Sequence, residues 1–354
     1  MKFAVIITVY KRYKYIKDAI NSVLSQTVKP DQILIVADNP KMLNNSMNVT
    51  IIEADYPQYG KMIFEAIKAL RDDIDIVYFL DDDDMFQKNK IEYINKIFEK
   101  RRDVVTVHNS KELVDESGNH LNLSYDIPFE VLIDRNKFRK INRQFPLGLG
   151  NNSAYSVRRE FLDEIRTNLS NINLALDTAL LYLSLEHNNL LLHIPEKLTI
   201  YRVGTGISAH YSKVIDYSKF LENKNKLVCT SNRYLEDFRY LGSLITSCKQ
   251  CKKEIITSCK QCKKEIITSC KQCKKEIQRT ILFLELYLSA ENEVFKCDYK
   301  AQLPPLNSLF FLSIKHYLDG SISAKDLYNI IKGVLGQLIL GKRRVSEIRS
   351  RKGY

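Results

Sequence analysis

The chain has 354 residues, of which 45% are hydrophobic, and this length allows one large domain with a smaller one beside it. Its formal net charge of +12 is concentrated in the last third: residues 1–242 hold 33 Lys and Arg against 32 Asp and Glu, whereas residues 243–354 hold 21 against 10. No run approaches the roughly 18 apolar residues of a membrane-spanning helix, so none is predicted.

Two features of the sequence bear on its compartment. The apolar start is short and is followed by Tyr10–Lys14 rather than by a small-residue cleavage site, so it is interpreted as a first strand and not as a signal peptide. Six of the eight cysteines lie in one repeated segment, which does not indicate a secreted disulfide scaffold. We therefore expect a cytoplasmic protein.

Strands and helices alternate over the first 110 residues. Apolar residues at helical spacing cover about 16–24, 62–70 and 91–98. The β-rich runs around them are Phe3–Val9, Gln32–Ala37, Val49–Ala54, Ile76–Asp81 and Val104–Val107. This alternation predicts an open α/β domain with a mostly parallel sheet flanked by helices.

Beyond residue 110 the pattern becomes less regular, and from about Val214 onward the chain is expected to be helical. Before that point we expect a hairpin turn, a strand, a helix with one apolar face and two further strands. These elements are assigned to Asp115–Gly118, Ala154–Val157, Ala175–Glu186, Leu190–Ile194 and Leu198–Val203.

Four consecutive carboxylates, Asp81–Asp84, end the strand that begins at Ile76. Like charges at this spacing repel, and burial adds to the cost. A divalent cation relieves both effects, since Mg²⁺ and Mn²⁺ prefer carboxylate oxygens and share their remaining positions with phosphates. Open α/β sheets also bind ligands just past the carboxyl ends of their strands. The alternative is a solvated acidic turn.

In order and spacing, five segments resemble the inverting family 2 glycosyltransferases with the GT-A fold, from Phe3 to about His210. The segments are Val5–Tyr10, Ala19–Thr27, Ile33–Asn39, Phe79–Asp84 and Asp177–Leu181. The resemblance implies transfer of a sugar, with inversion, from a UDP- or GDP-linked donor to a hydroxyl of a glycan or lipid-linked acceptor. It also implies Mn²⁺ or Mg²⁺ as the cofactor.

The resemblance assigns a metal site to the acidic segment. Asp81, Asp83 and Asp84 are the expected carboxylate ligands, and His210 is the expected imidazole ligand. A metal held there would bridge the diphosphate and neutralise the charge that develops as the bond to the sugar breaks. Asp81 is also expected to face the ribose.

Four further residues are expected to bind the nucleotide sugar. The resemblance implies that Asp38 meets the base, with Thr8 and Tyr10 lining the same pocket. Arg202 lies in a glycine-containing segment, Tyr201–His210, that resembles the region closing over the donor, and it is expected to contact the diphosphate. Asp38 has an alternative role as a turn residue, and Arg202 as a surface ion-pair partner.

Asp177 is the candidate general base. It lies early in an apolar helix, so burial would raise its pKa toward a useful range. A carboxylate that caps the helix is the alternative. Family members often carry an acidic residue directly before this Asp, where this chain has Leu176. The departure affects the expectation for acceptor recognition more than that for the base.

An 11-residue unit occurs three times without change, at 245–255, 256–266 and 267–277. Eleven residues make almost three helical turns, so added copies extend a helix without rotating its apolar face. We expect a long amphipathic helix that packs on its own chain or on a partner. The Cys-x-x-Cys pairs leave metal binding and redox pairing as alternatives.

The expected organisation is a GT-A domain at 1–212 and a helical region at 213–354 that ends in a basic tail, 342–354. The apolar helix expected at Leu327–Leu340, beside this tail, suits peripheral contact with the inner membrane surface, and a solvated charged tail is the alternative. The aromatic interleaving of a nucleic-acid reader is missing, so no nucleic-acid partner is expected.

Two other functions stay open. A non-catalytic scaffold would keep the GT-A-like fold and bind partners through the basic helical region. Nucleotidyl transfer on the same kind of sheet would need a glycine-rich phosphate loop near the first strand, and Lys11–Lys14 has no glycine.

Overall fold

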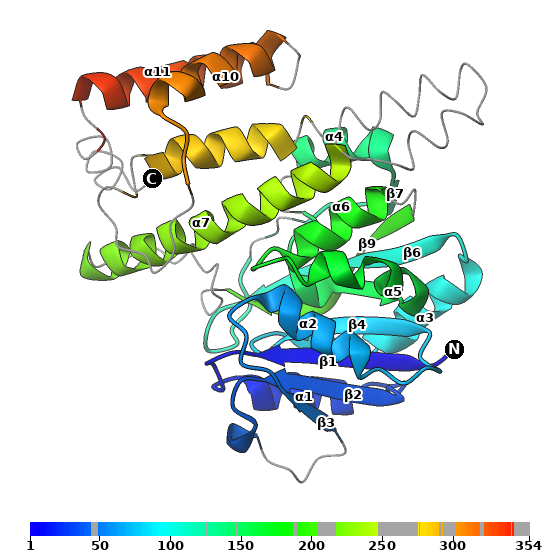
Figure 1. Cartoon of the computed structure of the whole chain (residues 1–354). Helices are drawn as coiled ribbons and strands as arrows, with labels where there is room; N and C mark the ends of the chain where they lie inside the picture. The colour runs from blue at the N-terminus through cyan, green and yellow to red at the C-terminus, as the bar shows by residue number, and fades with distance from the viewer. Residues whose placement is uncertain are drawn as a thin grey trace, which may run out of the picture. The chain divides into compact units, whose positions relative to one another are not determined.

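A computed structural model gives the structure of the chain (Figure 1). The chain forms two compact units, Met1–Gly206 and Ile207–Tyr354. The residues that the structure describes are 1–43, 49–122, 124, 126–145, 148–186, 190–203, 217–246, 275, 277–289, 292, 302–318, 322–340 and 342.

One mixed sheet forms the centre of the N-terminal unit. Its described strands are β1 (Phe3–Val9), β2 (Gln32–Ala37), β3 (Thr50–Glu53), β4 (Ile76–Asp81), β5 (Met85–Phe86), β6 (Val104–Val114), β7 (Val131–Ile133), β8 (Tyr155–Arg158) and β9 (Leu190–Arg202). They are ordered β3-β2-β1-β4-β8-β6-β9-β5, with β7 paired to β9. The first four run parallel, as do β6 and β9, whereas β8 is antiparallel to both of its neighbours.

Helices cover both faces of this sheet. They are α1 (Ile16–Leu24), α2 (Tyr59–Lys68), α3 (Lys90–Lys100), α4 (Arg135–Gln144), α5 (Arg159–Leu169) and α6 (Leu176–Glu186). α1 and α3 pack on one face, against alternate residues of β1, β2 and β4. α2, α5 and α6 lie on the other face (Figure 1). The predicted fold class, an open and mostly parallel sheet flanked by helices, is confirmed.

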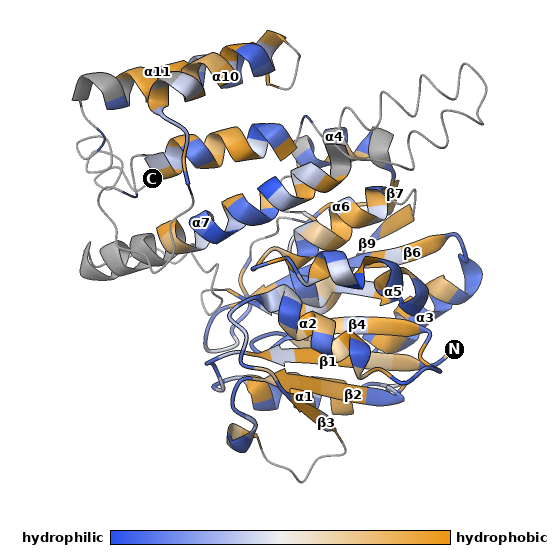
Figure 2. Cartoon of the chain, viewed as in Figure 1, coloured by the Kyte–Doolittle hydropathy of each residue, from blue (hydrophilic) through white to orange (hydrophobic). Residues whose placement is uncertain are grey.

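The covering helices explain why the central strands are continuous apolar runs rather than alternating ones. Every residue of β1 is buried, as are the first five of β4. Figure 2 shows these strands in the hydrophobic colour along their length. A strand buried on both faces has no solvent side for polar residues, so the polar groups collect at its ends.

Two expected strands, Leu190–Ile194 and Leu198–Val203, form the single strand β9. The gap expected between the two strands contains Pro195 and two charged residues. The chain instead continues through an irregularity, where the pairing with β6 jumps from Ile194 to Lys197. A proline is tolerated at such a position because it owes no ladder hydrogen bond there. β6 is correspondingly longer than expected, since it pairs with β9 along its length.

The described part of the C-terminal unit is helical, as expected. It contains α7 (Tyr217–Thr246), a helix at 277–289, α10 (Leu306–Leu318) and α11 (Ala324–Leu340). α10 and α11 pack on the helix at 277–289 through Leu282 and Leu286, and α7 packs on the same helix through Val228 and Leu235. Cys229 in α7 is disulfide-bonded.

Most of the repeat, residues 247–274, and nearly all of the basic tail lie outside the described residues. The predictions of a long amphipathic helix over the repeats and of their cysteine chemistry therefore stay predictions. Among the helices that the structure describes, none combines the length and the apolar character needed to cross a bilayer.

A buried histidine pair joins β6 to β9. His108 and His193 are opposite each other in the two strands, with their Nδ1 atoms 2.9 Å apart, and His193 Nε2 lies 2.9 Å from the carbonyl oxygen of Ile127. Burial lowers the pKa of His193 to about 4 and that of His108 well below its usual value. Both rings are therefore neutral at physiological pH.

This pair predicts acid sensitivity. A histidine whose pKa is depressed in the folded state contributes stability that is complete above its unfolded pKa of about 6.5 and is lost as the pH falls toward 4. Between pH 7.5 and 4.5, the free energy of unfolding should fall by about 2 kcal/mol more in the unmodified protein than in His193→Gln, measured by urea denaturation. His120→Gln, at an exposed histidine, is the control and should keep the original slope. Equal slopes in the unmodified protein and His193→Gln would contradict the prediction.

Candidate functional site

The acidic segment Asp81–Asp84 lies at the carboxyl end of β4, next to the carboxyl end of β1. Thr8 of β1 is the register partner of Asp81. From β1 the chain passes to β2 on one side, while β4 lies on the other side, so the order of strands reverses at this point. Such a switch point leaves a crevice between the loops that diverge from it, and open α/β sheets bind ligands there.

Asp81 is held by a partly buried tyrosine that belongs to another element. Tyr59 Oη donates to Asp81 Oδ1 at 2.6 Å and accepts a hydrogen bond from Thr8 Oγ1 at 2.8 Å. Burial raises the pKa of Tyr59 well above its usual value, and the charge of Asp81 adds to the effect. The phenol therefore stays protonated and acts as a donor to the carboxylate.

Close packing at the start of α2 fixes the position of Tyr59. The backbone N–H groups of Tyr59 and Gly60 donate to the carbonyl oxygens of Asn173 and Ile172, at 2.8 and 3.0 Å. A Cβ atom on Gly60 would lie 1.9 Å from the carbonyl oxygen of Leu169, so only glycine lets the two segments approach this closely.

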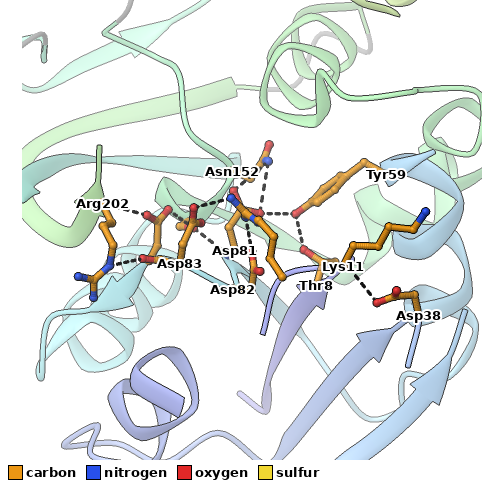
Figure 3. Close-up of polar contacts among 12 residues, drawn as sticks. Thr8, Lys11, Asp38, Tyr59, Asp81, Asp82, Asp83, Asn152 and Arg202 are labelled. Atoms are coloured by element: carbon orange, nitrogen blue, oxygen red, sulfur yellow. Dashed lines mark hydrogen bonds and ion pairs between the residues drawn. The ribbon is translucent and has the colours of Figure 1, made fainter. Parts of the chain in front are cut away.

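Asp82 and Asp83 share one guanidinium. Arg12 Nη1 donates to Asp83 Oδ2 at 2.9 Å, and Arg12 Nη2 donates to Asp82 Oδ1. The loop that carries Arg12 is held by Asp38, whose Oδ1 accepts the backbone N–H of Lys11 at 3.0 Å. Figure 3 shows the labelled carboxylates of this region between Asp38 on the right and Arg202 on the left.

Asp84 is enclosed by protein donors. Its Oδ2 accepts hydrogen bonds from Ser153 Oγ at 2.7 Å and from Asn151 Nδ2 at 2.8 Å, and its Oδ1 accepts the backbone N–H of Arg202 at 3.0 Å. The side chain has no exposed surface. Asp84 therefore ties the acidic segment to the end of β9 and to the segment before β8.

Asn151 and Asn152 connect the acidic segment to Asp177. The backbone N–H of Asn151 donates to Asp177 Oδ2 at 2.9 Å, while its side chain holds Asp84. Asn152 Oδ1 accepts the backbone N–H of Asp177 at 2.9 Å, and Asn152 Nδ2 lies 3.3 Å from Asp81 Oδ2. Two adjacent residues thus fix Asp177 relative to both ends of the acidic segment.

Arg202, a predicted diphosphate contact, is engaged by the protein. Its Nε donates to the carbonyl oxygen of Asp83 at 3.2 Å, Nη1 to that of Glu116 at 3.0 Å, and Nη2 to Asp18 Oδ2 at 3.2 Å. The guanidinium lies 4.2 Å from the centre of the Tyr15 ring. In this arrangement Arg202 supports the backbone of the acidic segment.

Negative charge in the segment is only partly compensated. Burial, with repulsion from Asp83, raises the pKa of Asp81 to about 6, and burial raises that of Asp82 to about 7 despite Arg12. The pKa of Asp84 is raised well above its usual value for the same reasons. The segment would thus gain from additional positive charge.

The residues expected at the site come together at one edge of the sheet, as far as the structure describes them. Thr8, Asp38, Asp81, Asp83, Asp84 and Asp177 belong to the connected set above. Tyr10 is half-buried in the β1–α1 loop, with Lys11 Nζ 5.0 Å from its ring centre. His210 lies outside the described residues. The roles predicted for all of these residues stay predictions.

Sequence reasoning missed Tyr59, Arg12, Asn151 and Asn152. Tyr59 and Arg12 contact the acidic segment from elements far away in the chain, which apolar periodicity does not reveal. Asn151-Asn152 falls in a polar stretch whose composition indicated a loop. An available signal was the position of Arg12, directly after a strand that ends beside the acidic segment.

Among the residues that the structure describes, no three His, Cys, Asp or Glu side chains form a group that could hold a metal ion. Asp84 turns toward protein donors and Asp82 toward Arg12. A metal bound here would therefore need ligands besides these carboxylates.

The profile of one protein family covers most of the N-terminal unit: residues 4–166 match "Glycosyl transferase family 2". This region belongs to glycosyltransferase family 2. A glycosyltransferase of Rickettsia conorii, described as uncharacterized, is 33% identical over 141 residues, which are 36% of this chain and 22% of that protein. A second, from Nostoc, is 34% identical over 125 residues, 32% of this chain and 38% of that protein. The match thus spans less than two fifths of the length of these relatives.

Solved structures share the fold. TarS 1-349 of S. aureus aligns over 100% of this chain and 92% of its own, with a TM-score of 0.57 and 15% identity. The same protein in complex with UDP-GlcNAc aligns over 95% of this chain and 91% of its own, with a TM-score of 0.50 and 14% identity. At this identity the similarity establishes the fold alone.

The Tyr59 contacts generate a prediction for the family 2 domain. Tyr59→Phe removes the donor to Asp81 and leaves the Thr8 hydroxyl without its acceptor. Because a hydrogen bond to a charged group is lost, the free energy of unfolding should fall by about 1–3 kcal/mol, measured by urea denaturation at pH 7.5. Tyr56→Phe, at an exposed tyrosine nearby, should change it by less than about 0.5 kcal/mol. An equal effect of both substitutions would refute the assigned role of Tyr59.

Proposed function

We propose that the protein transfers a sugar, with inversion, from a nucleotide diphosphate sugar to a hydroxyl group, and that residues 1–212 form the transferase domain. The observation that carries the proposal is the link made by Asn151 and Asn152 between the acidic segment and Asp177. It joins a site for a charged donor to a candidate base. A scaffold protein would have no need for this connection.

The acidic segment fits a divalent cation. Its donors are carboxylate oxygens, which Mg²⁺ and Mn²⁺ prefer. Burial, with repulsion from Asp83, raises the pKa of Asp81 and Asp82, and a cation would offset this cost to their charged forms. Mg²⁺ is usually held by one or two carboxylates together with substrate phosphates, so a ready-made group of three ligands is not required. We assign Asp83 and Asp81 as its protein ligands, with Asp84 holding the segment from within. When bound, the metal would neutralise charge on the leaving diphosphate.

The strand ends supply the nucleotide contacts. In the proposal, Asp38 and Tyr10 lie on the side of the base, and Asp81, oriented by Tyr59, meets the ribose. A uridine nucleotide is the favoured donor class, since TarS, whose fold this chain shares, has been solved with UDP-GlcNAc. Guanosine nucleotides are the alternative. A screen with Mn²⁺ that varies the donor sugar and the acceptor, a glycan or a lipid-linked hydroxyl, and measures released nucleotide would identify both substrates.

Asp177 is the proposed general base. It accepts the proton of the attacking hydroxyl while the bond between the anomeric carbon and the diphosphate breaks, so that the configuration at that carbon inverts in one displacement. Its two oxygens accept the backbone N–H groups of Asn151 and Thr178, at 2.9 and 2.6 Å. These bonds fix the direction in which the carboxylate faces the acceptor.

Asp177→Asn tests the base. Transfer to the acceptor found in the screen should fall by about 10²–10⁴-fold, the usual contribution of general acid–base catalysis, because an amide cannot take the proton. The UDP affinity, measured by calorimetry in Mn²⁺, should stay within about twofold because Asp177 does not contact the nucleotide in this proposal. Asp163→Asn, at a surface ion pair, is the control. Undiminished transfer by Asp177→Asn would exclude it as the base.

We also propose peripheral contact of the C-terminal unit with an anionic membrane. Phe311 and Leu318 on α10 are 67% and 78% exposed, and Tyr328 and Leu335 on α11 are 64% and 45% exposed. Both helices pack on Leu282 and Leu286 through their opposite faces, so these residues lie on one side. An exposed lysine, Lys315 or Lys332, sits within each pair. A second copy of the chain on this face would bring like-charged lysines together, which disfavours a dimer. Anionic lipid headgroups would instead attract these lysines, which favours a membrane.

Flotation with vesicles tests this contact. The full chain should bind vesicles of phosphatidylcholine and phosphatidylglycerol and should not bind vesicles of phosphatidylcholine alone. Replacing both Phe311 and Leu318 by Ser should weaken binding about tenfold or more, because buried apolar area and charge act together. Met42→Ser, which removes an exposed apolar residue from the other unit, is the control. Failure to bind anionic vesicles would exclude the proposed membrane contact. A dimer of the full chain that dissociates when both residues are replaced would also exclude it, because this face would then be a dimer interface.

A further inference from the structure

The backbone of Arg12 is fixed on both sides by one carboxylate. Asp38 Oδ1 accepts the backbone N–H of Lys11 at 3.0 Å and the hydroxyl of Tyr13 at 2.7 Å, and Tyr13 Oη in turn accepts the backbone N–H of Asn39 at 2.8 Å. Lys11 adopts φ +57°, a left-handed conformation that residues with a side chain seldom take. This turn directs the next residue, Arg12, toward the acidic segment.

The side chain of Arg12 is less enclosed than its partners. It is 31% exposed, whereas those of Asp82 and Asp83 are 6% and 7% exposed. The carboxylates are thus more enclosed than the arginine side chain that pairs with them. A long side chain on the solvent side can change partners without rearrangement of the core, which the two carboxylates cannot do.

One oxygen of Asp83 is the point of competition. Asp83 Oδ2 accepts the hydrogen bond from Arg12 Nη1 at 2.9 Å, and Asp83 is the carboxylate assigned above to the divalent cation. A guanidinium and a divalent cation on the same oxygen would repel each other. The oxygens of a diphosphate offer the guanidinium the same forked acceptor geometry as the two carboxylates do.

We propose that Arg12 is a displaceable counter-ion of the donor site. It pairs with Asp82 and Asp83 when no nucleotide is bound, and it transfers from Asp83 to the diphosphate when the nucleotide arrives with its metal. The inference rests on the proposed function, because it assumes that this site takes a metal and a nucleoside diphosphate. Its consequence is positive coupling: metal alone must compete with Arg12, while metal with nucleotide releases it.

Arg12→Gln tests the exchange without a transfer assay. Binding of Mn²⁺ alone, followed by electron paramagnetic resonance of the free ion, should become about tenfold tighter, because the competing cation is gone. The UDP affinity in saturating Mn²⁺, measured by calorimetry, should become about tenfold weaker, because one charged phosphate contact is lost. Lys96→Gln, which removes an exposed lysine from α3, is the matched control and should change neither affinity.

A double-mutant cycle locates the effect. In an Asp83→Asn background, Arg12→Gln should no longer tighten Mn²⁺ binding, because the shared oxygen has lost its charge. Circular dichroism checks each fold, and if Arg12→Gln does not fold, Arg12→Met carries the test, since it also removes the charge and keeps an unbranched, flexible side chain. Unchanged Mn²⁺ and UDP affinities in Arg12→Gln would overturn the proposal and make Arg12 a fixed anchor. An unmodified protein that binds neither Mn²⁺ nor any nucleotide would overturn the proposed function as well.

Discussion

Four carboxylates in succession at the end of a buried strand impose the main constraint on the N-terminal unit. Like charges held this closely are stable only when other parts of the chain bring donors to them. Those donors come from separate elements: Tyr59 from the start of α2, Arg12 from the β1–α1 loop, Asn151 and Ser153 from the segment before β8, and Arg202 from the end of β9. The acidic segment is therefore the point at which distant parts of the chain are fixed relative to one another.

The carboxylates of this segment differ in how firmly they are held. Asp84 is completely buried among hydroxyl, amide and backbone donors, which hold it in one position and so fix the backbone beside its neighbours. Asp82 and Asp83 instead face a partly exposed arginine. Under the proposed function, a rigidly held Asp84 and a partly exposed arginine beside Asp82 and Asp83 would suit a site that accepts and releases a charged ligand.

The parts of the fold that follow from local patterns could be predicted from the sequence. The strands up to Asp81 and the helices between them have the apolar spacing of their structures. The carboxyl end of the strand that begins at Ile76 indicated the acidic segment, whereas Thr8 and Asp38 were implied by the resemblance to family 2. The contacts of Tyr59 and Arg12 could not be predicted in this way, because they depend on how α2 and the first loop pack in three dimensions. The break expected near Pro195 was wrong because pairing with β6 outweighs the local preference of a proline.

Asn151 adopts φ +90° and ψ 117°, a backbone conformation that glycine enters freely and that strains a residue with a side chain. Glycine would relieve that strain and would also delete the amide that holds Asp84. Residue 151 thus makes two opposed contributions to stability, backbone strain and a hydrogen bond to a buried carboxylate. Because strain at one residue and a hydrogen bond to a buried charge are of similar size, about 1–3 kcal/mol each, the strained conformation persists at no net cost to the folded state.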